Sequence, residues 1–184
     1  MIKNPDFPPH EFRCRKVYLL ENLPAPLTRA DEHWQIFDDY TAWPEFRLRQ
    51  IRVPQTREWF RVKEEIIVSE TGHGLREEIS RTFLPGDETG GTGPHPEKEI
   101  RKNRYFYEFA DREFALDVFM GALWGLILAQ VNFADKDEAA LFSTPEFAAT
   151  EVSGNEFFRG ENLVEKDFEA VRKEFARLKV MGNE

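Results

Sequence analysis

Two uncharged amides stand at alternate positions of an apolar segment, a pattern that would suit a metal site if both were acids. In the run from Leu126 to Phe133, an extended chain places Gln130 and Asn132 on one face and apolar side chains on the other. Two carboxylates on such a face would suit a divalent cation, whereas an amide offers a neutral oxygen and an NH2 donor that prefers anions. The segment therefore predicts a strand whose side-chain spacing suits a metal site but whose amide groups suit an anion.

Basic residues gather in a second part of the chain, where Glu58 is the only acid between Phe46 and Lys63. The cations of this stretch are Arg47, Arg49, Arg52, Arg57, Arg61 and Lys63. The whole chain has a net charge of −9, which argues against nucleic-acid binding because phosphate contacts need a basic face. A basic patch in an acidic protein favours a small anionic ligand in a pocket, and solvated strand charges are the alternative.

Composition predicts one folded domain over residues 1–184, with a loose proline-rich arm over 1–10 and a terminal helix over 165–184. The chain is 41% hydrophobic and 32% charged, too apolar for disorder and too charged for a membrane protein. No membrane partner is expected, because the longest uncharged run, which includes residues 118–132, is interrupted by glycines and amides. The first residues lack the apolar run of a secretion signal, and Cys14 alone cannot form an internal disulfide, so a cytoplasmic location is expected.

Hydrophobic periodicity predicts many strands and few helices. Period-two patterns predict strands at 11–20, 46–52, 58–68, 74–83, 99–109, 113–119 and 126–133, with a small edge strand at 150–153. Capping residues and helical spacing predict helices from Arg29 toward Tyr40, at 135–142 and at 165–180. Residues 84–97 are rich in Gly and Pro and predict a long loop. The fold class is α+β, an antiparallel β-barrel of about eight strands with flanking helices and a polar lumen.

Several short runs occur in an order that resembles a known family. They are residues 45–49, 60–63, 76–78, 102–105, 114–119, 126–133 and 151–153. This ordered set, from about Glu45 to Leu163, resembles the CYTH domain proteins, also called triphosphate tunnel metalloenzymes. The resemblance implies an eight-stranded tunnel whose wall carries basic residues for a triphosphate and acidic residues for magnesium or manganese. Activities in that family include inorganic, thiamine and RNA triphosphatases and a class of adenylate cyclase.

The basic half of the family's site is retained in this sequence. The resemblance implies phosphate-binding roles for Arg47, Arg49, Lys63, Arg76, Lys102 and Arg104. Arg47 and Arg49 lie on one predicted strand, and Lys102 and Arg104 lie on another. The two-residue spacing of each pair puts both of its side chains on one face of the strand. Arginine suits a triphosphate because its guanidinium group can grip two oxygen atoms at once.

The acidic half of the family's site is eroded. Gln130 and Asn132 stand where the family has its last Glu-x-Glu pair. Further acids are replaced by Ser80 and Ala115. The first-strand motif Glu-x-Glu-x-Lys is disrupted in either register: with Lys16 aligned to the lysine, Phe12 and Cys14 replace both acids; with Arg15 aligned, Glu11 survives and Arg13 reverses the second charge. Glu78 and Asp117 are then the remaining candidates for metal ligands.

Three functions remain open from the sequence, and with them the question of whether the chain is an enzyme. The first is a CYTH-like tunnel protein that binds a phosphorylated or polyanionic small molecule with weak or no metal-dependent hydrolysis, and requires no cofactor. The second is an active triphosphatase for inorganic, thiamine or nucleoside triphosphate, which would use magnesium or manganese. The third is a scaffold or partner-binding domain whose lumen is filled by its own side chains. Because dimers are common in the resembling family, a homodimer is a further expectation.

Overall fold

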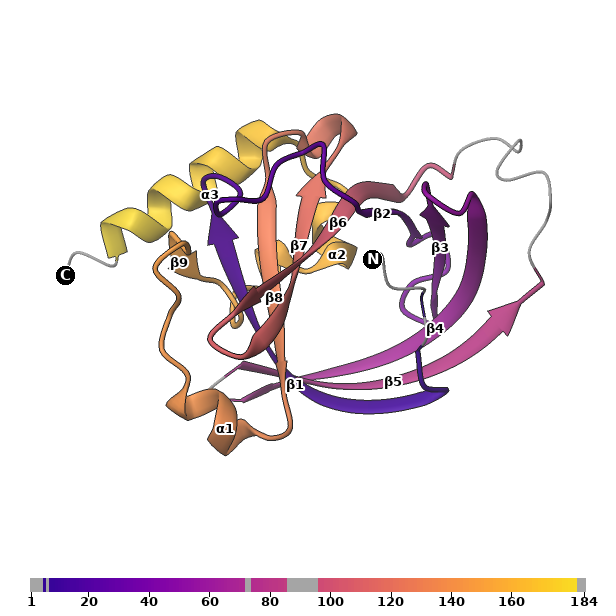
Figure 1. Ribbon diagram of the computed structural model, residues 1–184, viewed down its shortest axis with the longest axis horizontal. Helices are drawn as coiled ribbons and strands as arrows, with labels where there is room; N and C mark the ends of the chain where they lie inside the picture. The colour runs from indigo at the N-terminus through magenta and orange to yellow at the C-terminus, as the bar shows by residue number, and fades with distance from the viewer. Residues whose placement is uncertain (1–4, 6, 72–73, 86–95, 182–184) are drawn as a thin grey trace.

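The chain folds into a closed antiparallel barrel with short helices around it (Figure 1). The computed structural model describes residues 5, 7–71, 74–85 and 96–181. The strands are β1 (His10–Leu20), β2 (Trp34–Asp39), β3 (Arg47–Val53), β4 (Glu58–Thr71), β5 (Gly74–Leu84), β6 (Glu99–Phe109), β7 (Arg112–Phe119), β8 (Ile127–Phe133) and β9 (Thr150–Glu151). Strands β5-β4-β3-β2-β6-β7-β8-β1 are hydrogen-bonded in that order, and β1 also pairs with β5, which closes an eight-stranded barrel.

The remaining elements lie outside the barrel wall. They are the 3-10 helices η1 (Gly121–Leu123) and η2 (Glu156–Phe158) and the α-helices α1 (Lys136–Leu141), α2 (Gly160–Leu163) and α3 (Phe168–Met181). The short strand β9 pairs with β1 at Tyr18 and Leu19. No helix of the described part of the chain is long and apolar enough to cross a membrane.

Most predicted elements are confirmed, and one is wrong. The seven predicted strands, the edge strand and the helices near 135–142 and 165–180 are present. The predicted helix from Arg29 to Tyr40 is instead strand β2, in which Trp34, Ile36 and Asp38 are buried. Thr28 and Asp31 stand where the predicted helix would begin, but their contact closes only a single turn, in which both the backbone N–H and the hydroxyl of Thr28 donate to the Asp31 carboxylate.

The barrel interior has three layers, of which the middle one is charged. At one end an apolar group of Trp34, Ile36, Ile51 and Val53 fills the lumen, and Phe7 packs edge-on against Trp34. At the other end a second apolar group closes it, which comprises Val17, Leu19, Tyr40, Ile100, Phe119, Leu123, Leu126, Leu128, Val152, Phe158, Leu163 and Val171. Each strand contributes to the middle layer through the same alternation that supplies its apolar inward side chains.

The C-terminal third of the chain seals one end of the barrel. Helix α3 lies along this end, and its Val171 belongs to the second apolar group (Figure 1). The approach is close at Gly125, where a Cβ atom would lie 2.6 Å from the ring of Phe168. This residue also has a φ of +110°, so both its backbone and its lack of a side chain are needed there.

Three sequence predictions fall partly outside the described residues. Of the predicted long loop at 84–97, residues 86–95 lie outside them, and so do residues 1–4 and 6 of the predicted N-terminal arm and residues 182–184 of the predicted terminal helix. Within the described part of the arm, Phe7 packs on Trp34 and the Pro8 carbonyl accepts a hydrogen bond from Arg81.

Candidate functional site

The middle layer of the lumen is a continuous chain of ion pairs that begins on β1 and β5. Arg15 and Arg13 both donate to the carboxylate of Glu77, at 2.7 and 2.6 Å. Arg13 and Glu77 are direct cross-strand neighbours, which places their opposite charges together on the inner face. Glu11 continues the chain: its carboxylate lies 3.8 Å from Arg13 and 2.7 Å from Arg81.

The ion pairs continue across β4, β3 and β2. Glu64 accepts from Arg81 at 2.9 Å and from Arg47, and all three side chains are buried or nearly so. Arg49 makes a bidentate pair with Asp38, with N–O distances of 2.6 and 2.8 Å. Such paired hydrogen bonds fix the planar guanidinium group in direction as well as position.

The chain ends on β6 and β7. The ammonium group of Lys102 lies between two acids, 3.3 Å from Asp38 and 2.9 Å from Asp117. Arg104 completes the series with a bidentate pair to Asp117, at 2.7 and 2.8 Å. The set defined by these contacts, called the charge chain below, comprises Arg15, Glu77, Arg13, Glu11, Arg81, Glu64, Arg47, Arg49, Asp38, Lys102, Asp117 and Arg104.

Gln130 links Arg15, at one end of the charge chain, to Asp117, the partner of Arg104 at the other end. Its carbonyl oxygen accepts from Arg15, and its NH2 group donates to Asp117 at 2.8 Å. A carboxylate at this position could accept from Arg15 but could not donate to Asp117. The amide is therefore the side chain that fits between a guanidinium group and a carboxylate that is already ionised. Asn132, the second amide of the strand, is exposed near the end of β8.

Burial and charge act in opposite directions on the acids of the charge chain. Burial alone would raise the pKa of Glu77, but the charges of Arg15 and Arg13 lower it to about 2. The pKa values of Asp38, Glu64 and Asp117 are likewise held below their ordinary values by neighbouring Arg and Lys, against the effect of burial. All four acids are thus ionised at neutral pH, and each has its charge satisfied by cations of the protein.

These lowered pKa values predict a loss of stability in acid. The native acids bind fewer protons than the unfolded ones, so their contribution is complete above about pH 5 and is lost as the pH falls toward about 2. For Glu77 alone, a shift from 4.5 to about 2 corresponds to about 3 kcal/mol. Urea unfolding at pH 7, 4 and 3 should show the free energy of unfolding falling steeply below pH 4. An unchanged value between pH 6 and 3 would contradict the ion pairs described.

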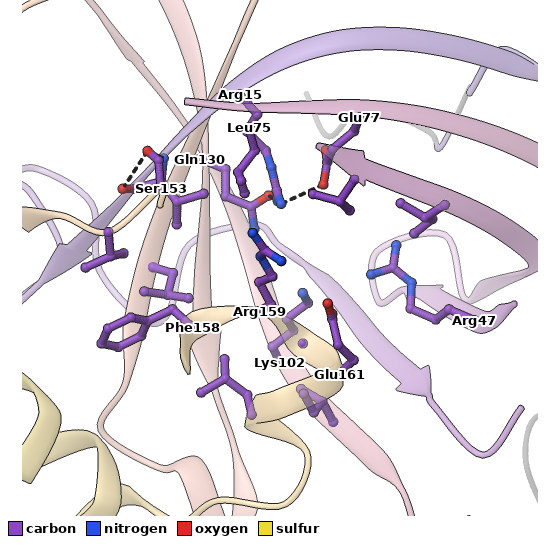
Figure 2. Close-up of a pocket in the computed structure, with 18 of the residues that line it drawn as sticks. Arg15, Arg47, Leu75, Glu77, Lys102, Gln130, Ser153, Phe158, Arg159 and Glu161 are labelled. Atoms are coloured by element: carbon purple, nitrogen blue, oxygen red, sulfur yellow. Dashed lines mark hydrogen bonds and ion pairs between the residues drawn. The ribbon is translucent and has the colours of Figure 1, made fainter. Parts of the chain in front are cut away.

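A cavity opens beside the charge chain, toward the end sealed by the C-terminal segment. Its enclosed volume is about 80 Å³, and its polar lining includes Arg15, Glu77, Lys102, Arg104 and Gln130. Figure 2 shows Arg159 and Glu161, from the segment around α2, pointing toward the same space as Arg15 and Gln130. Gly160 holds this segment against the wall, because a Cβ atom there would lie 1.8 Å from the Tyr40 hydroxyl.

The structure separates the sequence-predicted site residues into two groups. Arg47, Arg49, Lys102, Arg104 and Asp117 lie together in the lumen, as the resemblance implied. Lys63, Arg76 and Glu78 were expected to face the lumen, and this expectation is wrong. Each lies one position away from an inward-facing residue of β4 or β5. Lys63 pairs with the exposed Glu65 on the outer face, and both Arg76 and Glu78 are exposed. The corresponding inward residues are Glu64 on β4 and Glu77 on β5.

Other lumen residues were not singled out from the sequence. They are Asp38, Glu64, Glu77, Arg81 and Arg159. A usable signal was present: Val62, Ile66 and Val68 share a face with Glu64, and Leu75 and Ile79 share one with Glu77. On β1, Glu11, Arg13 and Arg15 face the charge chain, whereas Lys16 faces outward to Glu151 and the Phe142 carbonyl. The structure therefore adopts the register in which Arg15 occupies the lysine position.

The lumen acids do not fit the magnesium or manganese site that the resemblance implies. The two predicted ligands, Glu78 and Asp117, lie on opposite faces of the wall, since Glu78 is exposed and Asp117 is fully buried. Asp117 already accepts hydrogen bonds from Arg104 and Gln130, and it pairs with Lys102. Among the described residues, no group of three or more His, Cys, Asp or Glu could hold a metal ion. A hard dication needs several anionic or carbonyl oxygens that are free to bind it, and these acids are committed to cations.

Comparisons with known proteins agree with the barrel. No family model matches the chain. An inorganic triphosphatase of Acetivibrio thermocellus is 32% identical over 69 residues, which cover 38% of this chain and 43% of that protein. The match thus spans less than half of that relative's length.

Two solved structures share the fold over most of the chain. One, described as the hypothetical protein NE1496, has a TM-score of 0.60 at 21% identity and covers 84% of this chain and 99% of its own. The other, described as the inorganic triphosphatase NE1496, has a TM-score of 0.57 at 20% identity and covers 83% and 93%. These findings agree with the resemblance that the strand motifs indicated: the chain has the CYTH-like tunnel fold.

Proposed function

We propose that the lumen binds a phosphorylated or otherwise polyanionic small molecule, with weak or no metal-dependent hydrolysis. The observation that carries this proposal is the charge chain itself, in which guanidinium and ammonium groups from β1, β3 and β6 converge beside a cavity. A guanidinium group binds phosphoryl oxygens through the same fork geometry that it uses for a carboxylate, so these donors suit a phosphoryl group. All of these residues belong to one barrel, so a single copy of the chain would be enough to form the binding site.

Efficient hydrolysis is disfavoured by the same contacts. Attack of water on a phosphoryl group is fast where a metal ion neutralises charge and activates the water. The acids that would hold the ion are ion-paired, and Gln130 supplies a donor where the family has an acid. The relative named as an inorganic triphosphatase keeps the hydrolytic alternative open, and an assay for released phosphate with manganese present addresses it.

Replacing Arg15 with Gln tests the binding proposal. Arg15 lines the cavity, and Glu77 retains Arg13 as a partner when Arg15 is lost, so the barrel should remain folded. We expect the affinity for pyrophosphate and tripolyphosphate, measured by calorimetry in EDTA, to fall at least about tenfold, because a charged hydrogen bond contributes about 1.5–3 kcal/mol. Binding should also weaken as salt is raised.

The matched control is Arg76→Gln, which removes the same charge from the opposite face of the neighbouring strand, where Arg76 pairs in register with Cys14. It should change the affinity by less than about twofold, since exposed charges contribute little to a ligand held in the lumen. Equal losses in both variants would show a surface effect. If neither anion binds the wild-type protein, the scaffold alternative is favoured.

A further inference from the structure

The charge chain carries more positive than negative groups. Within the described residues it contains seven cations, namely Arg13, Arg15, Arg47, Arg49, Arg81, Lys102 and Arg104. Five carboxylates oppose them, namely Glu11, Asp38, Glu64, Glu77 and Asp117. Arg159 and Glu161 line the same cavity and add one charge of each sign. The lumen therefore holds an excess of two positive charges.

The excess is concentrated where the two ends of the charge chain meet. Both terminal members are cations, Arg15 and Arg104, and the neutral Gln130 connects Arg15 to Asp117, whose single charge Arg104 shares with Lys102. Arg15 shares the single charge of Glu77 with Arg13, and its Nε atom is buried without a hydrogen-bond acceptor. Burial also lowers the pKa of Arg15 to about 10, which the charge of Glu77 only partly offsets. A buried cation that lacks full compensation is costly, so this position favours an added anion.

The cavity at this position is small. Its volume of about 80 Å³ compares with the roughly 10–15 Å³ that one enclosed water needs on the same measure, so it has room for about half a dozen waters. A tetrahedral oxyanion replaces a few waters, whereas a tripolyphosphate is about three times as long. A tripolyphosphate also carries about four negative charges near neutral pH, twice the excess that the lumen offers.

We infer that the lumen selects a compact oxyanion of about two negative charges, a phosphoryl dianion, in preference to a triphosphate. Its oxygens would be bound beside Gln130 by Arg15, Lys102, Arg104 and Arg159. The inference rests on the proposed function and narrows its ligand class. The acids of the charge chain, Glu77 above all, already neutralise cations that a longer polyphosphate would otherwise neutralise. The group could be free phosphate or the terminal group of a phosphate monoester.

The test compares anions of increasing charge at constant ionic strength. Calorimetric titrations in EDTA at about pH 8, where phosphate groups are mostly dianionic, would use orthophosphate, glycerol 3-phosphate, pyrophosphate and tripolyphosphate. We expect orthophosphate or the monoester to bind the wild-type protein at least as tightly as tripolyphosphate. Binding of the monoester would identify a phosphoryl group as the ligand, and binding of orthophosphate alone would identify the free oxyanion.

Two variants test whether the charge balance of the lumen sets its preference between anions. Glu77→Gln removes one inward carboxylate and raises the excess to three, so the affinity for tripolyphosphate relative to orthophosphate should rise at least about tenfold. Glu78→Gln removes the adjacent outward carboxylate and should leave this ratio unchanged.

The inference is overturned if the wild-type protein binds tripolyphosphate more than about tenfold tighter than orthophosphate, or if Glu77→Gln binds anions but leaves the ratio unchanged. The wild-type order of affinities decides the matter if Glu77→Gln does not fold. Failure of the proposed function is a different result, since then none of the four anions binds in the lumen.

Discussion

Replacing Asp117 with Asn is expected to destabilise the barrel and, at the same time, to tighten anion binding. Asp117 is fully buried and neutralises both Arg104 and Lys102. Removing one partner of a buried ion pair costs about 3–5 kcal/mol, because the remaining charge stays buried without compensation. An anion that enters the lumen would supply the missing charge, so the variant should gain stability from phosphate by a larger margin than the wild-type protein.

Urea unfolding with and without phosphate measures both effects. The free energy of unfolding of Asp117→Asn should be about 3 kcal/mol lower in buffer, and phosphate should restore a large part of the difference. The control is Glu108→Gln, which removes an exposed carboxylate from β6 and should change the free energy by no more than about 0.5 kcal/mol. A variant that is destabilised but indifferent to phosphate would show that these ion pairs are structural and do not form an anion site.

Replacing Gln130 with Glu is expected to make the protein respond to divalent cations. The new carboxylate would stand where an NH2 group now lies 2.8 Å from Asp117, so two acids would meet inside the lumen. Like charges at this distance repel, which raises the pKa of the pair and weakens the fold without a cation. A manganese or magnesium ion could bridge them, since carboxylate oxygens are suitable ligands for both.

Thermal unfolding with manganese and with EDTA tests this expectation. Gln130→Glu should melt several degrees lower than the wild-type protein in EDTA, about the effect of 1–2 kcal/mol, and manganese should reverse the loss. The matched control is Asn132→Glu, which adds the same charge two residues farther along β8 at an exposed position. It should show little response to manganese. If wild-type and Gln130→Glu proteins respond equally to manganese, the amide does not set the metal preference of the lumen.

The sequence predicted the barrel because a strand's inward and outward residues differ in kind. Strand β1 and strands β3 to β8 were all located by their alternation and by the glycines and prolines between them. Strand β2 was missed because Thr28 and Asp31 imitate the start of a helix, and their contact closes only one turn. Its alternating Trp34, Ile36 and Asp38 carry the competing signal, which prevails because the neighbouring strands β3 and β6 both pair with it.

Which face of a strand looks inward was harder to predict for the charged residues. On β4 and β5 both faces carry ionisable groups. The presence of an ionisable group therefore does not show whether Lys63 or Glu64, or Glu77 or Glu78, faces the lumen. The apolar neighbours decide the face, because Phe60, Val62, Ile66 and Val68 share the side of Glu64, while Trp59 and Ile67 share that of Lys63. The partners of Glu77 could not be predicted, because Arg13 and Arg15 lie more than 60 residues away on β1, and the register between β1 and β5 brings them together.

One measurement tests most directly the claim that a cationic lumen binds anions without a divalent metal. It is a calorimetric titration of the wild-type protein with orthophosphate and with pyrophosphate in EDTA, repeated with manganese while released phosphate is monitored. We predict saturable binding of one anion per chain in EDTA, with an affinity that falls at least about tenfold in Arg15→Gln, and no release of phosphate from pyrophosphate. Binding that occurs only with manganese and is followed by phosphate release would contradict the account.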